Sequence, residues 1–199
     1  MSDGEAQWIW LACRTAVDVW DYDGWELVSE RMVALARRSG DLTALPLGLT
    51  LRMGAHLHAG ELAAVSSLHE EVSAINDATG THLAPYSALL LFAWRGSEAE
   101  CTGLIEATLR EVALRGEGQG VAVAQSAGAI LYNGLGRHHE ALPAARIASE
   151  CRGELVFRNW GLAELVEAAV HAARRRPRLT RSRASRRPRG PAVPIGHWG

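Results

Sequence analysis

The sequence predicts an all-α protein: a tetratricopeptide-like α-solenoid of antiparallel helical hairpins, followed by a disordered C-terminal tail. Three observations predict this fold. Glycines recur at intervals of 16 to 20 residues, the apolar residues between them follow helical spacing, and short turns recur every 36 to 40 residues. With 199 residues, of which 48% are apolar and 22% charged, the chain has the composition of a globular protein.

The regularly spaced glycines are expected to end helices, because glycine adopts the left-handed conformation without a Cβ clash. They are Gly40, Gly60, Gly80, Gly96, Gly116, Gly136 and Gly153. The segments between them are rich in Ala, Leu, Glu and Arg, which favour helix. The predicted helices cover residues 5–20, 24–39, 45–59, 61–79, 84–95, 97–115, 119–134, 138–150 and 157–173.

Apolar residues within these segments fall on one helical face. Trp25, Val28, Met32 and Leu35 are separated by 3, 4 and 3 residues, and similar steps occur at 62–75 and 101–112. The turns at 21–24, 59–61, 95–97 and 135–137 are short, so the helices that they join should be antiparallel neighbours. Because one hairpin cannot bury its apolar face alone, we expect the hairpins to stack in one domain, residues 1–173.

The tail, residues 174–199, differs in composition from the rest of the chain. It holds nine arginines and no acidic residue, a net charge of +9, whereas residues 1–173 hold twelve arginines and 22 acidic residues, a net charge of −10. Four of the seven prolines also lie here, so we expect disorder. We expect such a tail to bind nucleic-acid phosphates without sequence specificity, through Arg174, Arg175, Arg176, Arg178, Arg181, Arg183, Arg186, Arg187 and Arg189.

The same composition also arises when high-GC coding sequence is read out of frame or truncated. This explanation of the tail is slightly favoured over nucleic-acid binding.

Enzymatic chemistry has little support in the sequence. Lysine is absent, which excludes a Walker A loop, a Schiff-base lysine and a Ser-Lys pair. His56 and His58 are two apart on a predicted helix and do not face each other, and His138-His139 follow a turn; neither pair predicts a metal site. Residues 116–120 are expected to connect two helices and not to form a phosphate loop. We therefore predict no catalytic, cofactor-binding or metal-ligating residue, and no cofactor.

Four tryptophans and a tyrosine gather near the N-terminus: Trp8, Trp10, Trp20, Tyr22 and Trp25. The preferred interpretation is packing of the first hairpin together with a face that would normally meet something upstream, and a groove for an aromatic ligand or partner is the other. The two are compatible, because the end of a solenoid exposes apolar surface.

The compartment expected from the sequence is the cytoplasm. Cys13, Cys101 and Cys151 are widely spaced and odd in number, as in reduced proteins. The first five residues are acidic, unlike a signal peptide, and the longest apolar stretch, 83–94, is too short to span a membrane.

Residues 129–148 resemble a tetratricopeptide repeat, with Tyr132, Leu135-Gly136 and Glu140-Ala141-Leu142 in the typical order. Over residues 20–170 the chain is similar to the helical-repeat region of large LuxR-type ATP-dependent transcriptional regulators of high-GC bacteria. The strings that carry this similarity are 20–25, 44–49, 58–64, 84–89, 93–96, 113–118, 131–137, 159–160 and 165–169.

The LuxR-type resemblance implies a middle module that senses a ligand or partner. The family also has an ATPase module and a helix-turn-helix domain, and this sequence has neither pattern. We therefore expect a non-enzymatic protein-interaction or regulatory module, a fragment of a LuxR-family regulator, with a protein or peptide on the solenoid face. The alternative is a nucleic-acid-binding protein that acts through its arginine-rich tail.

Overall fold

The computed structural model describes residues 3–80, 85–151 and 155–175, and all nine elements within them are α-helices. The all-α class is therefore confirmed for these residues. The helices are α1 Asp3–Asp18, α2 Tyr22–Ser39, α3 Ala44–Ala59, α4 Leu62–Thr79, α5 Tyr86–Arg95, α6 Glu98–Arg115, α7 Gly118–Gly134, α8 His138–Glu150 and α9 Leu155–Arg175.

Glycines end most of these helices in the way that the sequence predicts. Six of the seven regularly spaced glycines have φ between 66° and 76°, the left-handed region, and the seventh, Gly153, lies outside the described residues. The Gly40 N–H, for example, points back to the carbonyls of Ala36 and Arg37. Helix α1 differs, because Trp20, with φ 61°, takes the left-handed position, and α8 ends at Cys151 in an extended conformation.

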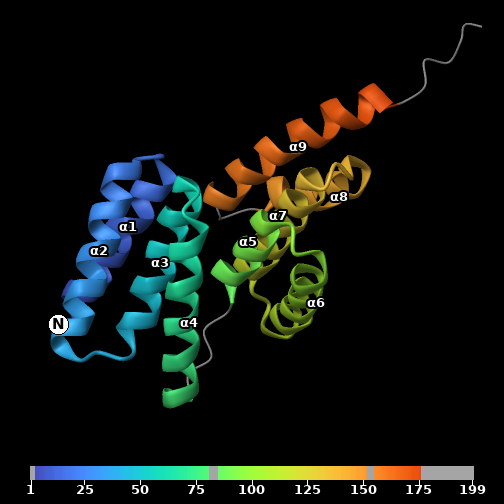
Figure 1. Cartoon of the computed structure of the whole chain (residues 1–199). Coiled ribbons are helices and arrows are strands. Elements are labelled where there is room, and N and C mark those ends of the chain that lie inside the picture. The colour runs from blue at the N-terminus through green and yellow to red at the C-terminus, as the bar shows by residue number, and fades with distance from the viewer. Residues whose placement is uncertain (1–2, 81–84, 152–154, 176–199) are drawn as a thin grey trace, which may run out of the picture.

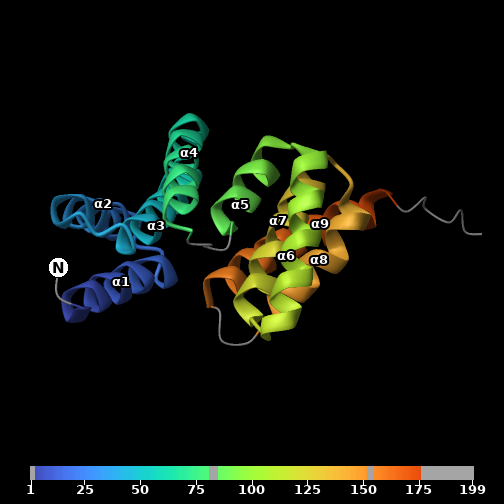
Figure 2. The same ribbon diagram turned by 90° about the horizontal axis from the view of Figure 1, so that it is seen from below.

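Consecutive helices contact each other along the whole described chain, more weakly between α4 and α5 and between α5 and α6 than elsewhere (Figures 1 and 2). The odd-numbered helices also contact one another in sequence: α1 with α3, α3 with α5, α5 with α7 and α7 with α9. In both views α1–α4 form one group and α5–α9 another. Contacts of α3 and α4 with α5, and of α1 with α9, join the two groups.

One continuous apolar core runs through both groups. Its fully buried members include Leu49 and Leu57 of α3, Leu89 and Leu91 of α5 and Leu131 of α7. A smaller cluster forms around Cys13, Ala16, Trp25 and Ala55, where α1, α2 and α3 meet. None of the described helices is long and apolar enough to cross a membrane.

Helices approach closely where glycine replaces a side chain. A Cβ on Gly161 of α9 would lie 2.7 Å from the Ser149 backbone nitrogen of α8. A Cβ on Gly54 of α3 would lie 2.4 Å from the Trp25 ring of α2. These glycines therefore set how near α8 lies to α9 and how Trp25 enters the space between the helices.

Candidate functional site

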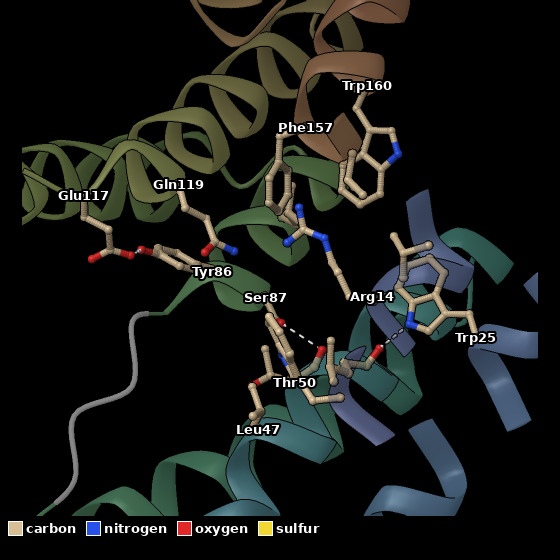
Figure 3. A pocket seen from close by; sticks show the side chains of 16 residues that line it. Arg14, Trp25, Leu47, Thr50, Tyr86, Ser87, Glu117, Gln119, Phe157 and Trp160 are labelled. Atoms are coloured by element: carbon tan, nitrogen blue, oxygen red, sulfur yellow. Dashed lines mark hydrogen bonds between the residues drawn. The ribbon is translucent and has the colours of Figure 1, made fainter. Parts of the chain in front are cut away.

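A cavity of about 420 Å³ lies between the two groups of helices (Figure 3). We call it the central cavity. Its walls come from α1, α2, α3, α5 and α9 and from the start of α7. Most of its lining is apolar or aromatic: Trp10, Val17, Trp25, Leu47, Leu51, Leu90, Val156, Phe157 and Trp160.

Trp25 is fixed in the wall by a hydrogen bond and by the missing side chain of Gly54. Its indole Nε1–H donates to the Leu51 carbonyl over 2.9 Å, and only 7% of the residue is exposed. Any side chain at Gly54 would collide with the ring. Trp25 therefore presents one rigid aromatic surface to the cavity.

Polar groups gather where α5 and the start of α7 border the central cavity. The Tyr86 hydroxyl donates a hydrogen bond to the Glu117 carboxylate, and Gln119 lies nearby (Figure 3). The Ser87 hydroxyl donates to the Thr50 carbonyl over 3.3 Å, which links α5 to α3 across the two groups. These groups give the cavity hydrogen-bonding capacity next to its apolar wall.

Arg14 is the one cationic side chain of the lining. Its Nε lies 3.5 Å from Oδ1 of Asp18, one turn along α1. Figure 3 shows its guanidinium beside Phe157, between the Tyr86 side of the cavity and the Trp160 side. A guanidinium has five N–H donors, so Arg14 can bind a polar ligand group while it keeps Asp18.

The lining contains no histidine or cysteine, and its one carboxylate, Glu117, accepts the Tyr86 hydrogen bond. Within the described residues, no group of three or more His, Cys, Asp or Glu side chains is placed to hold a metal ion. The arrangement therefore offers apolar surface, hydrogen bonds and one guanidinium, which suits binding of a compact ligand.

A second, smaller hollow adjoins the central cavity and shares three of its residues. We call it the aromatic pocket; its volume is about 50 Å³ and it is lined by Val17, Trp20, Tyr22, Trp25, His58 and Trp160. The His58 ring centroid lies 4.6 Å from that of Trp160 and 5.2 Å from that of Trp25. Five of the six residues thus contribute a ring.

The surroundings of His58 favour its neutral form. Its Nδ1 lies 2.9 Å from the Gly54 carbonyl, and the residue as a whole is exposed. Desolvation by the packed rings lowers the pKa of His58, and the hydrogen bond to Gly54 opposes this effect only in part.

The structure separates the histidines that are close in sequence. His56 is largely buried and pairs with Glu61 over 2.5 Å, whereas His58 points to the indoles. His138 is buried and stacks on His171 of α9 at 4.4 Å. Of residues 116–120, Gly116 and Glu117 connect α6 to α7, with Gly116 in the left-handed region, and residues 118–120 form the first turn of α7.

The N-terminal aromatic residues divide into one that packs inside the first hairpin and several that form an exposed face. Only Trp25 is buried; Trp8 is 70% exposed, Trp20 60% and Tyr22 38%. The physical reason is geometric: Trp25 lies on the face that α2 turns to α3, while Trp20 lies in the turn before α2. Trp10, Trp20, Tyr22 and Trp25 instead line one or both of the hollows.

The structure describes little of the predicted nucleic-acid site. Arg174 and Arg175 are the last two residues of α9, so the helix runs two residues into the segment predicted as the tail. The other seven arginines, from Arg176 to Arg189, lie outside the described residues.

Sequence reasoning missed Phe157, Trp160, Tyr86, Gln119 and Arg14 as neighbours in one site, since they come from four helices without a shared motif. The clustered tryptophans were the one local signal. No family model matches the chain, and no curated protein or solved structure shows significant similarity to it.

Proposed function

We propose that this protein is a non-enzymatic binding module and that the central cavity is its ligand site. The observation that carries the proposal is the convergence of aromatic and polar side chains from six helices on one hollow of about 420 Å³. This volume lies within the range of about 300–1,000 Å³ that is typical of ligand pockets. It is large enough for one or two anchoring side chains of a peptide.

We further propose a tetratricopeptide-like solenoid as the scaffold of this site. The contacts of each odd-numbered helix with the next odd-numbered helix, and with its even-numbered neighbours, are those expected of stacked hairpins. In such a stack the odd-numbered helices line the inner face. Five of the six helices around the cavity are odd-numbered, and the exception is α2. The resemblance to the middle region of LuxR-type regulators supports a regulatory role, in which the ligand changes how the two groups are held together.

Binding is favoured over catalysis by the chemistry of the lining. The residues that could act as nucleophiles, Ser87 and Tyr86, donate to Thr50 and Glu117. Neither has a histidine beside it in the lining, so the Ser-His or Cys-His type of activated nucleophile has no counterpart there. We propose the cytoplasm as the compartment, which the three cysteines without disulfides support.

A selection from a displayed library of linear peptides against the full chain tests this proposal. We expect enriched peptides to carry an aromatic or aliphatic anchor and to lose binding when the cavity is filled by Gln119→Trp or Thr50→Trp. The matched control is Leu114→Trp, because Leu114 is 90% exposed on α6, away from the cavity. Equal binding of the selected peptides to the filled variants and the control would overturn the assignment.

The alternative function is nucleic-acid binding through the arginine-rich tail, favoured by the charge of +9 on residues 174–199. In fluorescence anisotropy with a duplex of random sequence, the intact chain should then bind with a steep salt dependence. Replacing the arginines from Arg176 to Arg189 with glutamine should abolish both the binding and its salt dependence. Binding that survives this replacement would rule out the tail as its cause.

A further inference from the structure

Trp20 has a left-handed backbone conformation, with φ 61°, at a helix end where six other turns have glycine. It is the one residue other than glycine with positive φ in the described part of the chain. The Trp20 N–H donates to the Val17 carbonyl over 3.2 Å, and the Asp21 N–H to the Ala16 carbonyl over 2.9 Å. This is the same pair of hydrogen bonds that surrounds Gly40. A Cβ at such a position is strained, so glycine would be more stable here.

Burial does not offset the strain at Trp20, because the residue is 60% exposed. An unfavourable backbone conformation that brings no packing in return points to a binding role for the side chain. The indole forms one wall of the aromatic pocket, opposite residues of α2, α3 and α9.

The charges around the aromatic pocket favour a cation. Faces of tryptophan and tyrosine rings carry negative potential, which attracts ammonium and guanidinium groups. Burial raises the pKa of the Tyr22 hydroxyl, and the negative charges of Asp23, Glu26 and Glu61 raise it further. The positive charge of Arg52 lowers this pKa. Burial lowers the pKa of the neighbouring His58, which disfavours a competing positive charge among the same rings.

We propose that the aromatic pocket, formed by Trp20, Tyr22, Trp25, His58 and Trp160, binds a weakly hydrated cation, either a quaternary ammonium or a guanidinium group. Such a group can come from a separate ligand or from an arginine of residues 176–199 of the same chain. The aromatic pocket has three lining residues of its own, Trp20, Tyr22 and His58, and shares Val17, Trp25 and Trp160 with the central cavity.

The test compares choline with 3,3-dimethylbutan-1-ol, which has the same shape but no charge, by titration into the full chain at constant ionic strength. Tryptophan fluorescence and amide chemical shifts report binding. We expect saturable binding of choline that is about tenfold tighter than that of the neutral alcohol. Equal affinities would overturn the proposal.

Trp20→Gly separates function from folding. It should weaken choline binding at least fivefold while it raises the Tm by about 2–4 °C, because it relieves the strained backbone. Trp8→Ala is the matched control: Trp8 is also exposed but lies outside the aromatic pocket, so choline binding should not change. Unchanged binding in Trp20→Gly, or equal losses in both variants, would contradict the assignment.

The source of the cation is resolved with the full-length variant in which the arginines from Arg176 to Arg189 are glutamines. Tighter choline binding to this variant than to the unmodified chain assigns the pocket to the chain's own arginines. Equal binding assigns it to a separate ligand. Loss of choline binding in this variant would contradict a site built from the five pocket residues.

Discussion

The side-chain amide of Asn133 on α7 donates to both the backbone carbonyl and the carboxylate of Glu164 on α9, over 3.0 and 2.8 Å. Its oxygen lies 3.2 Å from Nδ1 of His138, the first residue of α8. One amide therefore connects three helices. Burial raises the pKa of Glu164, and the hydrogen bond from Asn133 opposes that shift because it stabilises the charged form.

Asn133→Ala should destabilise the protein by about 1–3 kcal/mol, since it leaves polar groups of Glu164 and His138 buried without this partner. The free energy of unfolding in urea measures the effect. Asp77→Ala, at an exposed position on α4, controls for the higher helix propensity of alanine. If both variants unfold at the same urea concentration, the amide does not stabilise the packing of α7 with α9.

Two glycines inside helices should respond in opposite ways to the same substitution. A Cβ at Gly161 would lie 2.7 Å from the Ser149 backbone nitrogen and 2.8 Å from the Ala148 Cβ, so Gly161→Ala must push α9 from α8. We expect a loss of roughly 1–3 kcal/mol. A Cβ at Gly103 meets nothing within 4 Å, so Gly103→Ala should add about 1 kcal/mol of helix stability. Thermal unfolding followed by circular dichroism gives both signs, and a loss in each variant would refute the steric argument.

The helices could be predicted from the sequence because glycine spacing and apolar periodicity are local signals. Observed bounds agree with predicted ones to within two residues for all nine helices. The end of α1 was placed two residues late, at 20 and not at Asp18, for an identifiable reason. The residue that stops this helix is Trp20, and the prediction relied on glycine as the stop signal.

The site could not be predicted in the same way, because it depends on which helices meet. Phe157 and Arg14 line the same cavity although they are far apart in the sequence, and neither belongs to a motif. The tryptophan cluster was recognised, and its position at the end of the helical stack predicted both packing and an exposed face, but not which tryptophan takes which place. The exposed state of Trp20 depends on the conformation of the turn after α1, which no local pattern specified.

Acid should destabilise the protein through His58 and His69. Burial lowers the pKa of both below the ordinary value of 6.5; it is opposed at His58 by the Gly54 carbonyl and at His69 by Glu70. The unfolded chain therefore binds more protons than the folded one, so stability present above pH 6.5 is lost as the pH falls through the folded-state pKa values. Burial raises the pKa of Glu164, so the folded chain binds this proton more tightly than the unfolded chain. Protonation of Glu164 at lower pH therefore adds stability.

The contribution of His58 is isolated by comparing urea midpoints at pH 7.5 and 6.0 in the unmodified chain and in His58→Gln. We expect the midpoint of the unmodified chain to fall more over this interval than that of the variant. The rings around His58, those of Trp25, Trp94 and Trp160, carry no charge and do not titrate. A steeper fall in the variant than in the unmodified chain would show that the sign is wrong.

The three cysteines should differ sharply in reactivity. Cys13 and Cys101 are fully buried, and burial raises the pKa of each thiol to about 11. At pH 8 only about one in a thousand of these thiols is then ionised, and the thiolate is the reactive form. Cys151, just after α8, is partly exposed.

Ellman's reagent should therefore modify one thiol per folded chain and three thiols per chain unfolded in urea. In the Cys151→Ser variant, no thiol should react before the chain unfolds. Rapid modification of two or more thiols in the folded protein would mean that the core around α1 or α6 opens far more readily than its burial implies.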